Sequence, residues 1–258
     1  MFAFFKSLFE SPETAEEQRG RPRLDAADFS AIYAVGDVHG CMGLLKEAYA
    51  RIVADNEDQS GQKLVVFLGD YVDRGMSSRA VLDFLSRQSP EGLYHVCLCG
   101  NHDLEFLRFL RDPKNNMGWL NFGGLETLRS YGIDAEHTLK GGGGQSGLLR
   151  MVKEAVPDRH VRFLADLPSM LVVGKLVFAH AGIRPGVPLE KQTDEDLMWI
   201  REPFLARGPE MPFVVVHGHT VCSEPSFSSG RVGIDTGAYS TGRLTVLKIR
   251  RGKAKTLR

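Results

Sequence analysis

Residues 63–75 read Lys-Leu-Val-Val-Phe-Leu-Gly-Asp-Tyr-Val-Asp-Arg-Gly. The apolar run 63–68 predicts a buried strand, because a short continuous apolar stretch that ends in glycine is typical of a strand covered on both faces. The polar residues that follow, Asp70, Asp73 and Arg74, then lie on a loop at the end of that strand. This arrangement of a buried strand followed by a polar loop decides the fold, since it recurs along the chain.

The same form appears in several other places, each an apolar run that ends in glycine or polar residues. Between the early runs, residues 42–53 and 78–86 have helical spacing, which predicts strand-helix-strand units and therefore parallel pairing. The side chains that carry chemistry then fall on loops at strand ends. The other predicted strands cover residues 31–35, 94–98, 176–179 and 213–216.

The second half of the chain adds helices and a second group of strands. Residues 104–167 favour helices, with Pro157 suited to a first helical turn and residues 141–144 marking a flexible glycine loop. We expect this region to form a helical cap over the site. The fold predicted is α/β, with two packed mixed β-sheets (a β-sandwich) flanked by helices. Strands of the second sheet are expected at residues 171–179, 213–216, 232–234 and 244–249.

Length and composition bound the class of protein. A chain of 258 residues, 43% of them hydrophobic, is long enough for one domain with a sizeable core. We predict an N-terminal arm or linker over residues 1–28 and a single domain over residues 29–258. Lysine plus arginine and aspartate plus glutamate both total 32, so the overall charge favours neither nucleic acid nor an anionic membrane.

The N-terminus and the cysteines indicate where the protein works. Residues 1–9 are rich in phenylalanine but hold only one basic residue, Lys6, so they make a poor signal peptide and are too short to span a bilayer. We expect an amphipathic helix that docks on the protein or a partner, with contact to a membrane surface as the alternative. The cysteines form no C-x-x-C pair, which favours reduced thiols and a cytoplasmic location. They are Cys41, Cys97, Cys99 and Cys222.

Loops at the strand ends are rich in the side chains that bind metals. Any one of these loops alone is weak evidence, because an aspartate after a strand is often a helix cap and a lone histidine is often structural. Together, carboxylate, imidazole and amide oxygen donors suit manganese, iron or zinc, whereas calcium favours oxygen alone. The loops are GDVHG at 36–40, GDYVDRG at 69–75, GNHD at 100–103, HAG at 180–182 and HGHT at 217–220.

A pair of divalent ions bound by such loops has a characteristic chemistry. Two ions about 3.5 to 4 Å apart generate a hydroxide and clamp both oxygens of an in-line displacement. Glycines beside the ligands let the backbone turn sharply and leave room for metals and substrate. The sequence therefore predicts transfer of a phosphoryl group to water.

These five blocks, in this order, resemble the phosphoprotein phosphatase family of bacterial-type Ser/Thr protein phosphatases, within the calcineurin-like metallophosphoesterases. The resemblance runs from about Ile32 to the GIDTG and GRLT blocks at 233–237 and 242–245. It implies the calcineurin-like fold, a catalytic domain at residues 29–258 and two divalent ions, manganese first, with iron or zinc as alternatives. It also implies six metal ligands: Asp37, His39 and Asp70 on one ion, with Asp70 bridging, and Asn101, His180 and His219 on the other.

The resemblance also assigns the catalytic groups. His102 would be the general acid that protonates the leaving oxygen, and Asp73 would orient it. The alternative is that His102 caps the following helix while Asp73 pairs with Arg74. Arg74 and Arg201 would clamp the phosphate, since a guanidinium engages two phosphoryl oxygens at once. For Arg201, a surface salt bridge with the adjacent glutamate is the alternative.

The function implied is hydrolysis of phosphomonoesters, with phosphoserine, phosphothreonine and phosphotyrosine in proteins as substrates, by direct attack of a metal-bridging hydroxide. The enzymatic alternative is a symmetric bis(5'-nucleosyl)-tetraphosphatase that cleaves dinucleoside polyphosphates. The other alternative is an inactive module that binds metal or phosphate. Val221 replaces the second histidine of the G-H-x-H block that many nucleases of the wider group carry, which favours the phosphatase branch and leaves His217 a structural role.

One further block is shared by both bacterial branches and so does not choose between them. Residues 119–128 read WLNFGGLETL, which fits a W-x-x-x-G-G-x-x-T-L pattern. From sequence alone we interpret this block chiefly as a helix start that packs on the core.

Overall fold

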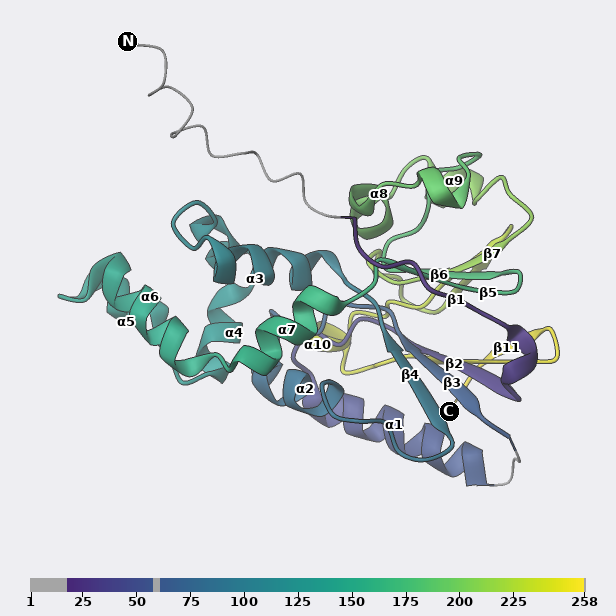
Figure 1. Cartoon of the computed structure of the whole chain (residues 1–258), viewed down its shortest axis with the longest axis horizontal. Helices are drawn as coiled ribbons and strands as arrows, with labels where there is room; N and C mark the ends of the chain where they lie inside the picture. Colours follow the sequence, from purple (N-terminus) through teal and green to yellow (C-terminus); the bar gives the residue numbers. More distant parts are fainter. Residues whose placement is uncertain (1–17, 58–60, 258) are drawn as a thin grey trace, which may run out of the picture.

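The computed structural model describes residues 18–57 and 61–257 of the chain. Two mixed β-sheets lie face to face, and helices flank them (Figure 1), so the predicted α/β sandwich is confirmed. In one sheet the order is β1 (Arg23–Leu24), β5 (Met170–Val173), β6 (Leu176–Ala179), β7 (Val214–His217), β9 (Arg231–Gly233), β8 (Ser226–Ser228). In the other it is β11 (Lys253–Thr256), β10 (Val246–Arg250), β2 (Ala31–Val35), β3 (Lys63–Phe67), β4 (Leu93–Cys97).

The predicted strand-helix-strand units are present at the start of the five-stranded sheet. β2 pairs in parallel with β3, and β3 in parallel with β4. The connections are α1 (Met42–Glu57) and α2 (Ser78–Leu85), which match the two segments with helical spacing. Because the strands are parallel, the loops that leave β2, β3 and β4 all emerge at the same edge of the sheet.

The expected strand at 171–179 is wrong in one respect, because the structure has a hairpin there. β5 and β6 pair antiparallel, and the chain reverses at Gly174, whose φ is +59°. The sequence did not predict this turn, because the residues on both sides of Gly174 are apolar and both strands of the hairpin are buried. The strand expected at 244–249 is present as β10, but it pairs antiparallel with β2 in the five-stranded sheet, so its placement in the second sheet was wrong. The short strands β1, β8 and β11 were not predicted, because they are brief or polar.

Three apolar layers hold the sandwich together. Between the sheets, Leu64 and Val66 of β3 belong to the same buried cluster as Phe178 of β6 and Val216 of β7. The outer face of the five-stranded sheet packs on α1 and α2. The outer face of the six-stranded sheet packs on α8 (Asp194–Trp199) and α9 (Phe204–Arg207).

The middle region is helical, as predicted. Figure 1 shows α5 and α6 projecting away from the two sheets, whereas α7 lies nearer to them. Pro157 is the N-cap of α7 and precedes its first turn, one residue before the predicted position. The helices of this region are α3 (Asn101–Arg111), η2 (Met117–Phe122), α4 (Gly124–Ser130), α5 (Ala135–Lys140), α6 (Gly144–Ala155) and α7 (Asp158–Asp166).

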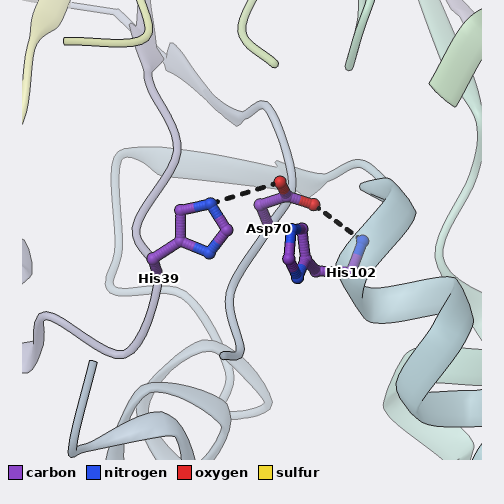
Figure 2. Close-up of side chains that lie close together, drawn as sticks. All are labelled: His39, Asp70 and His102. Carbon is purple, nitrogen blue, oxygen red and sulfur yellow. Dashed lines mark hydrogen bonds and ion pairs between the residues drawn. The ribbon is translucent and has the colours of Figure 1, made fainter. Parts of the chain in front are cut away.

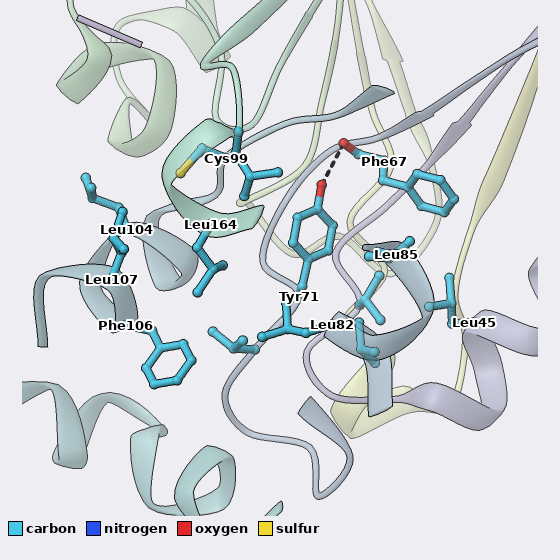
Figure 3. Packing of buried hydrophobic residues seen from close by; sticks show 14 of the residues in the cluster. Leu45, Phe67, Tyr71, Leu82, Leu85, Cys99, Leu104, Phe106, Leu107 and Leu164 are labelled. Atoms are coloured by element: carbon cyan, nitrogen blue, oxygen red, sulfur yellow. Dashed lines mark hydrogen bonds between the residues drawn. The ribbon is translucent and has the colours of Figure 1, made fainter. Parts of the chain in front are cut away.

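A buried tyrosine anchors the 69–75 loop to the core. Tyr71 is inaccessible to solvent, and Figure 3 shows its ring among leucines of α2, α3 and α7. Its hydroxyl donates to the carbonyl oxygens of Phe67 and Leu98, at 3.1 and 2.7 Å. An unpaired buried hydroxyl would cost free energy, so these bonds fix how the loop leaves β3 relative to the end of β4.

The described part of the predicted N-terminal arm lies against the domain. β1 pairs in parallel with β5, and the Arg19 guanidinium donates to the carbonyl oxygens of Leu164 and Leu167. The predicted docking helix at residues 1–9 lies outside the described residues. Among the helices that the structure describes, none has the length and apolar character needed to cross a bilayer.

Candidate metal centre

The predicted ligands come from five separate loops and gather in one buried cluster. Asp37 and His39 follow β2, Asp70 follows β3, and Asn101 begins α3 after β4. The other two come from the second sheet: His180 follows β6 directly, and His219 lies just beyond β7. All six residues are between 0 and 8% exposed.

Asp70 lies at the centre of the cluster. Its Oδ2 atom is 3.4 Å from His39 Nε2 and also 3.4 Å from His180 Nε2. Its Oδ1 atom accepts a hydrogen bond of 3.0 Å from the backbone N–H of His102 (Figure 2). The donor atoms of Asp37, Asp70 and His180 lie within 4.8 Å of one another, as do those of His39, Asp70 and His102. Both groups of potential ligands share Asp70.

The amide of Asn101 lies between two histidines. Its Oδ1 atom is 2.9 Å from His180 Nε2 and 3.0 Å from His219 Nδ1. Asp37 joins this group through its Oδ2 atom, which accepts from the backbone N–H of His219 at 3.0 Å. The structure therefore brings together side chains that are up to 182 residues apart in sequence.

The protonation of two histidines shows that the cluster fits a cation. His39 Nδ1 lies 2.9 Å from the Val72 carbonyl oxygen, and His180 Nδ1 lies 2.9 Å from that of Leu68. A carbonyl oxygen only accepts, so Nδ1 must carry the proton in both rings. In the neutral rings Nε2 is then an acceptor, and it faces the carboxylate of Asp70, which is an acceptor too. Acceptors that face one another across a buried space are the donor set a divalent metal needs.

Two carboxylates of the cluster, Asp37 and Asp70, differ in their electrostatic surroundings. Burial raises the pKa of Asp37, and the nearby Asp235 and Asp70 carboxylates raise it further. Asp37 Oδ1 is buried, and it has no hydrogen-bond partner among the described residues. For Asp70, burial raises the pKa, but the surrounding histidines outweigh it and hold the net value below the ordinary one. Bound cations would compensate these charges, since buried carboxylates are normally paired or metal-bound.

The backbone at the site is held in a conformation that most side chains avoid. Positive φ angles occur at His39 (42°), Asp70 (52°), Asp73 (71°), Arg74 (64°) and His219 (62°). Only two other non-glycine residues in the described part of the chain have a positive φ. Each such residue costs on the order of 1–3 kcal/mol, and such strain persists where the surrounding structure imposes it, often at functional sites.

Two glycines of the motifs are required by close contacts. A Cβ atom on Gly218 would lie 1.9 Å from Asp37 Oδ1, and one on Gly100 would lie 2.2 Å from Asp70 Oδ1. Any side chain at either position would displace a predicted ligand. This explains the glycines of the HGH and GNHD blocks physically.

His102 and Asp73 form a buried pair beside the cluster. His102 Nδ1 donates to Asp73 Oδ2 at 2.7 Å, so the alternative in which Asp73 pairs with Arg74 does not occur in the structure. Burial alone would lower the pKa of His102, but Asp70 and Asp73 outweigh it, and the net pKa of His102 is raised. The ring's other nitrogen, Nε2, faces Arg74 Nη2 at 3.1 Å.

The block at 119–128 does more than pack on the core, which corrects the interpretation from sequence. Trp119 Nε1 donates to Asp73 Oδ2 at 2.9 Å, and the Thr127 hydroxyl donates to Asp73 Oδ1 at 2.7 Å. Phe122 stacks on the His102 ring, with centroids 4.1 Å apart and planes 7° from parallel. The W-x-x-x-G-G-x-x-T-L pattern contains this tryptophan and threonine, but the sequence did not indicate that Asp73 is their partner.

Asp103 is a second residue whose role the sequence did not reveal. Its carboxylate accepts from the backbone N–H groups of Asp70, Tyr71 and Gly100 at 2.7, 2.8 and 3.0 Å. It therefore ties the loop after β3 to the start of α3. Burial and the nearby Asp70 carboxylate raise the pKa of Asp103 to about 8.

The two predicted phosphate clamps differ in their surroundings. Arg74 donates to the Tyr239 hydroxyl at 2.9 Å and lies over its ring at 4.8 Å, with no carboxylate partner among the described residues. Arg201 is exposed, and the structure shows no ion pair between it and Glu202 within the described chain. Trp199, two residues before Arg201, lies at the site, with its ring 6.1 Å from His219 and 5.9 Å from Phe122.

His217 stays outside the cluster. Its Nδ1 atom lies 3.1 Å from the Gly218 carbonyl oxygen, and its ring packs edge-on against Phe204 at 5.2 Å. Burial lowers the pKa of His217 to about 4. These contacts agree with a structural role.

Comparison with known proteins places this geometry in a family. A family model described as calcineurin-like phosphoesterase matches residues 30–242. The bis(5'-nucleosyl)-tetraphosphatase PrpE [asymmetrical] of Anoxybacillus flavithermus is 27% identical over 238 residues, which cover 83% of this chain and 88% of that protein. Serine/threonine-protein phosphatase 1 of Salmonella typhimurium is 27% identical over 239 residues, covering 88% and 95%.

A solved structure supports the fold. The cold-active protein-tyrosine phosphatase of a psychrophilic Shewanella superposes with a TM-score of 0.59 at 14% identity, covering 94% of this chain and 84% of that one. At that identity the likeness concerns the fold alone. The match of the family model over most of the chain goes further, and the chain belongs to the calcineurin-like phosphoesterase family.

Proposed function

We propose that the protein is a metal-dependent phosphatase that hydrolyses phosphomonoesters, with phosphoserine and phosphothreonine in proteins as its main substrates and phosphotyrosine as a further one. The observation that carries this proposal is the buried cluster around Asp70, in which carboxylate, imidazole and amide acceptors face one another. Such a donor set suits a pair of borderline divalent ions, and we propose manganese first, with iron or zinc as alternatives.

The ligands divide into two groups around Asp70. Asp37, His39 and Asp70 would hold one ion, while Asn101, His180 and His219 would hold the other with Asp70 between them. The equal distances from Asp70 Oδ2 to His39 and His180 support a bridging position for this carboxylate. When bound, the two ions would supply an activated water as nucleophile and would neutralise charge on the phosphate.

His102 would deliver a proton to the leaving oxygen from its Nε2 atom. Asp73 holds the proton on Nδ1, and Trp119 and Thr127 hold Asp73 in turn, so the ring keeps one orientation. An alkoxide is a poor leaving group, which is why a positioned acid accelerates the reaction. His102 also lies in one of the two possible ligand groups, so its role as acid and its role as ligand must be separated by experiment.

Arg74 would bind the phosphate from beside the acid. It now points to His102 Nε2 and Tyr239, and an incoming phosphate would offer it a stronger, charge-assisted partner. Moving Arg74 to the phosphate would free Nε2 to face the leaving oxygen. Arg201, exposed and without an ion pair among the described residues, would provide the second clamp.

The second candidate is hydrolysis of dinucleoside polyphosphates. Relatives from several bacteria carry the name bis(5'-nucleosyl)-tetraphosphatase, and the form named there is the asymmetrical one, whereas the sequence led us to the symmetric one. The aromatic rings of Phe122 and Tyr239, 37% and 42% exposed beside the cluster, would suit a nucleobase. An inactive binding module is disfavoured because the site retains every predicted ligand together with the acid.

The substrate class is tested by measuring turnover of phosphopeptides and of a dinucleoside tetraphosphate in parallel, with manganese present. We expect the phosphopeptides to be preferred by at least about a hundredfold in kcat/KM, which is about 2.7 kcal/mol of transition-state discrimination. The opposite preference would assign the chain to the tetraphosphatases. We propose a cytoplasmic location, for which the four free cysteines are the supporting observation.

A further inference from the structure

The two edges of the five-stranded sheet differ from each other. β4 is the last strand on its side, and no further strand pairs with it among the described residues. At the opposite edge, β11 is exposed and carries Lys253 and Lys255, a common way of discouraging pairing with other chains. β4 has no lysine, and it lies along a groove instead.

The hydrogen-bonding groups on the outer edge of β4 can be assigned from its pairing with β3. The Lys63 N–H donates to the Gly92 carbonyl oxygen, and the Leu98 N–H donates to that of Phe67. Even-numbered residues of β4 therefore face β3, and the backbone groups of His95 and Cys97 face outward. Within the described chain, these outward N–H and C=O groups have no backbone partner.

A groove of about 600 Å³ runs beside this edge. One wall is β4 itself, from Tyr94 to Cys97, and the other includes Phe163 of helix α7. The loop after α2 closes one end. A groove between an edge strand and a helix is the arrangement in which an extended peptide adds to a sheet, with main-chain bonds on one side and side-chain pockets on the other.

Arginines surround this groove. Arg87 follows α2, while Arg159 and Arg162 lie on α7, and all three are exposed. Arg159 pairs with Asp83, but Arg87 and Arg162 make no ion pair within the described residues. Among the described residues that line the groove, one carries a carboxylate, Asp166. The charge of the groove is therefore complementary to an acidic ligand.

We propose that this groove binds an extended acidic segment of a partner protein, which adds to β4 as a further strand. Its backbone would exchange hydrogen bonds with His95 and Cys97, and its carboxylates would pair with Arg87 and Arg162. This binding site goes beyond the proposed catalytic function, and no residue of the metal centre takes part in it.

The first test uses the full chain and a labelled peptide of alternating glutamate and valine, followed by fluorescence anisotropy. We expect saturable binding, and no binding of the matched lysine-valine peptide. The double change Arg87→Glu with Arg162→Glu should weaken binding at least about tenfold. The double change Arg150→Glu with Lys153→Glu on α6, at exposed positions outside the groove, alters the net charge by the same amount and is the control. Equal weakening by the control, or equal binding of the lysine peptide, would overturn the proposal.

The second test probes the strand pairing without changing the protein. N-methylation of a peptide amide removes its donor, and successive amides of a strand point to opposite edges. A peptide methylated at every second amide carries its methyl groups on one edge of the strand. Of the two such peptides, the one whose methyl groups point away from β4 should still bind. Methylation of every amide should abolish binding. Undiminished binding of the fully methylated peptide would rule out addition of a strand to β4.

Other occupants of the groove give distinct outcomes. Sedimentation should show that the protein does not self-associate through this edge. If the wild type is a dimer and the Arg87→Glu, Arg162→Glu variant is a monomer, the groove binds a second copy of the chain. Peptide binding that appears only after residues 1–17 are removed would assign it to the chain's own N-terminus. Either result would contradict an external partner. Turnover of a small aryl phosphate should stay unchanged in the arginine variant, which separates this proposal from the catalytic one.

Discussion

At the scale of single residues, the site depends on how its histidines are oriented. Backbone carbonyls fix the tautomers of His39 and His180, so that Nε2 of each ring faces Asp70. His102 is oriented by a carboxylate instead, which is the arrangement expected of a group that exchanges a proton. The difference between these partners is what separates the proposed ligands from the proposed acid.

Replacing His102 by asparagine separates the two roles that this residue could have. Because we assign it as the acid, His102→Asn should keep the metal content and reduce turnover of alkyl phosphates by about two orders of magnitude or more. Activated aryl phosphates, whose leaving groups need no proton, should be affected much less. Metal analysis and kcat for both substrate types give the answer; loss of metal or an equal loss on both substrates would count against the acid.

A change at Thr127 tests the hydrogen bond to Asp73, which the sequence did not predict. Thr127→Val removes the hydroxyl that donates to Asp73 Oδ1, so we expect about a tenfold loss on poor leaving groups, the size of one hydrogen bond to a charged group. Thr127→Ser keeps the hydroxyl and serves as the matched control. If serine and valine behave alike, the hydrogen bond to Asp73 has no role in positioning the acid.

At the scale of elements, the sequence predicted the strands that carry the site and missed some of what supports it. Buried parallel strands are continuous apolar runs, so β2, β3 and β4 and their loops could be located. The contact between Thr127 and Asp73 spans 54 residues. The hydrophobic periodicity of the sequence cannot predict such a contact, because the contact forms only when η2 and α4 pack beside the loop after β3.

The strand β4 also carries a histidine that affects stability in acid. Burial lowers the pKa of His95 to about 4, below its ordinary value of about 6.5. Between about pH 6.5 and pH 4, His95 is therefore protonated in the unfolded chain but not in the folded one. Stability is lost as the pH falls through that window.

His95→Gln should make the unfolding temperature fall less steeply between about pH 6.5 and pH 4. At pH 7.5 and above, where His95 is neutral in both states, the titration should contribute nothing. The exposed His137 on α5, changed to glutamine, is the control. If the unfolding temperatures of the wild type and the His95 variant fall equally steeply across this pH window, His95 does not have the role described.

At the scale of the whole molecule, the site exists because two sheets pack together. Asp37, His39, Asp70 and Asn101 follow strands of the five-stranded sheet, while His180 and His219 follow strands of the six-stranded one. The sequence showed that all six were present, but their distances depend on the packing of Leu64, Val66 and their neighbours between the sheets. Bound ions would therefore connect both halves of the sandwich.

This arrangement predicts that metal stabilises the fold. A ligand at about a hundred times its Kd adds about 2.7 kcal/mol to the folded state, which is roughly 5–10 °C in Tm for a chain of this size. We expect manganese to raise the Tm by that order and a chelator to reverse the shift. Asp70→Asn should remove most of the effect, since Asp70 contacts both groups. An unchanged Tm with manganese would show that the cluster does not hold it.

The most direct measurement is anomalous diffraction at the manganese edge from a crystal grown with excess manganese. We expect two peaks about 3.5 to 4 Å apart, one on either side of the Asp70 carboxylate. His39 should reach one of them, and Asn101, His180 and His219 the other. A single peak ligated by His102, or no peak among the six side chains, would contradict the paired-metal site on which the proposed function rests.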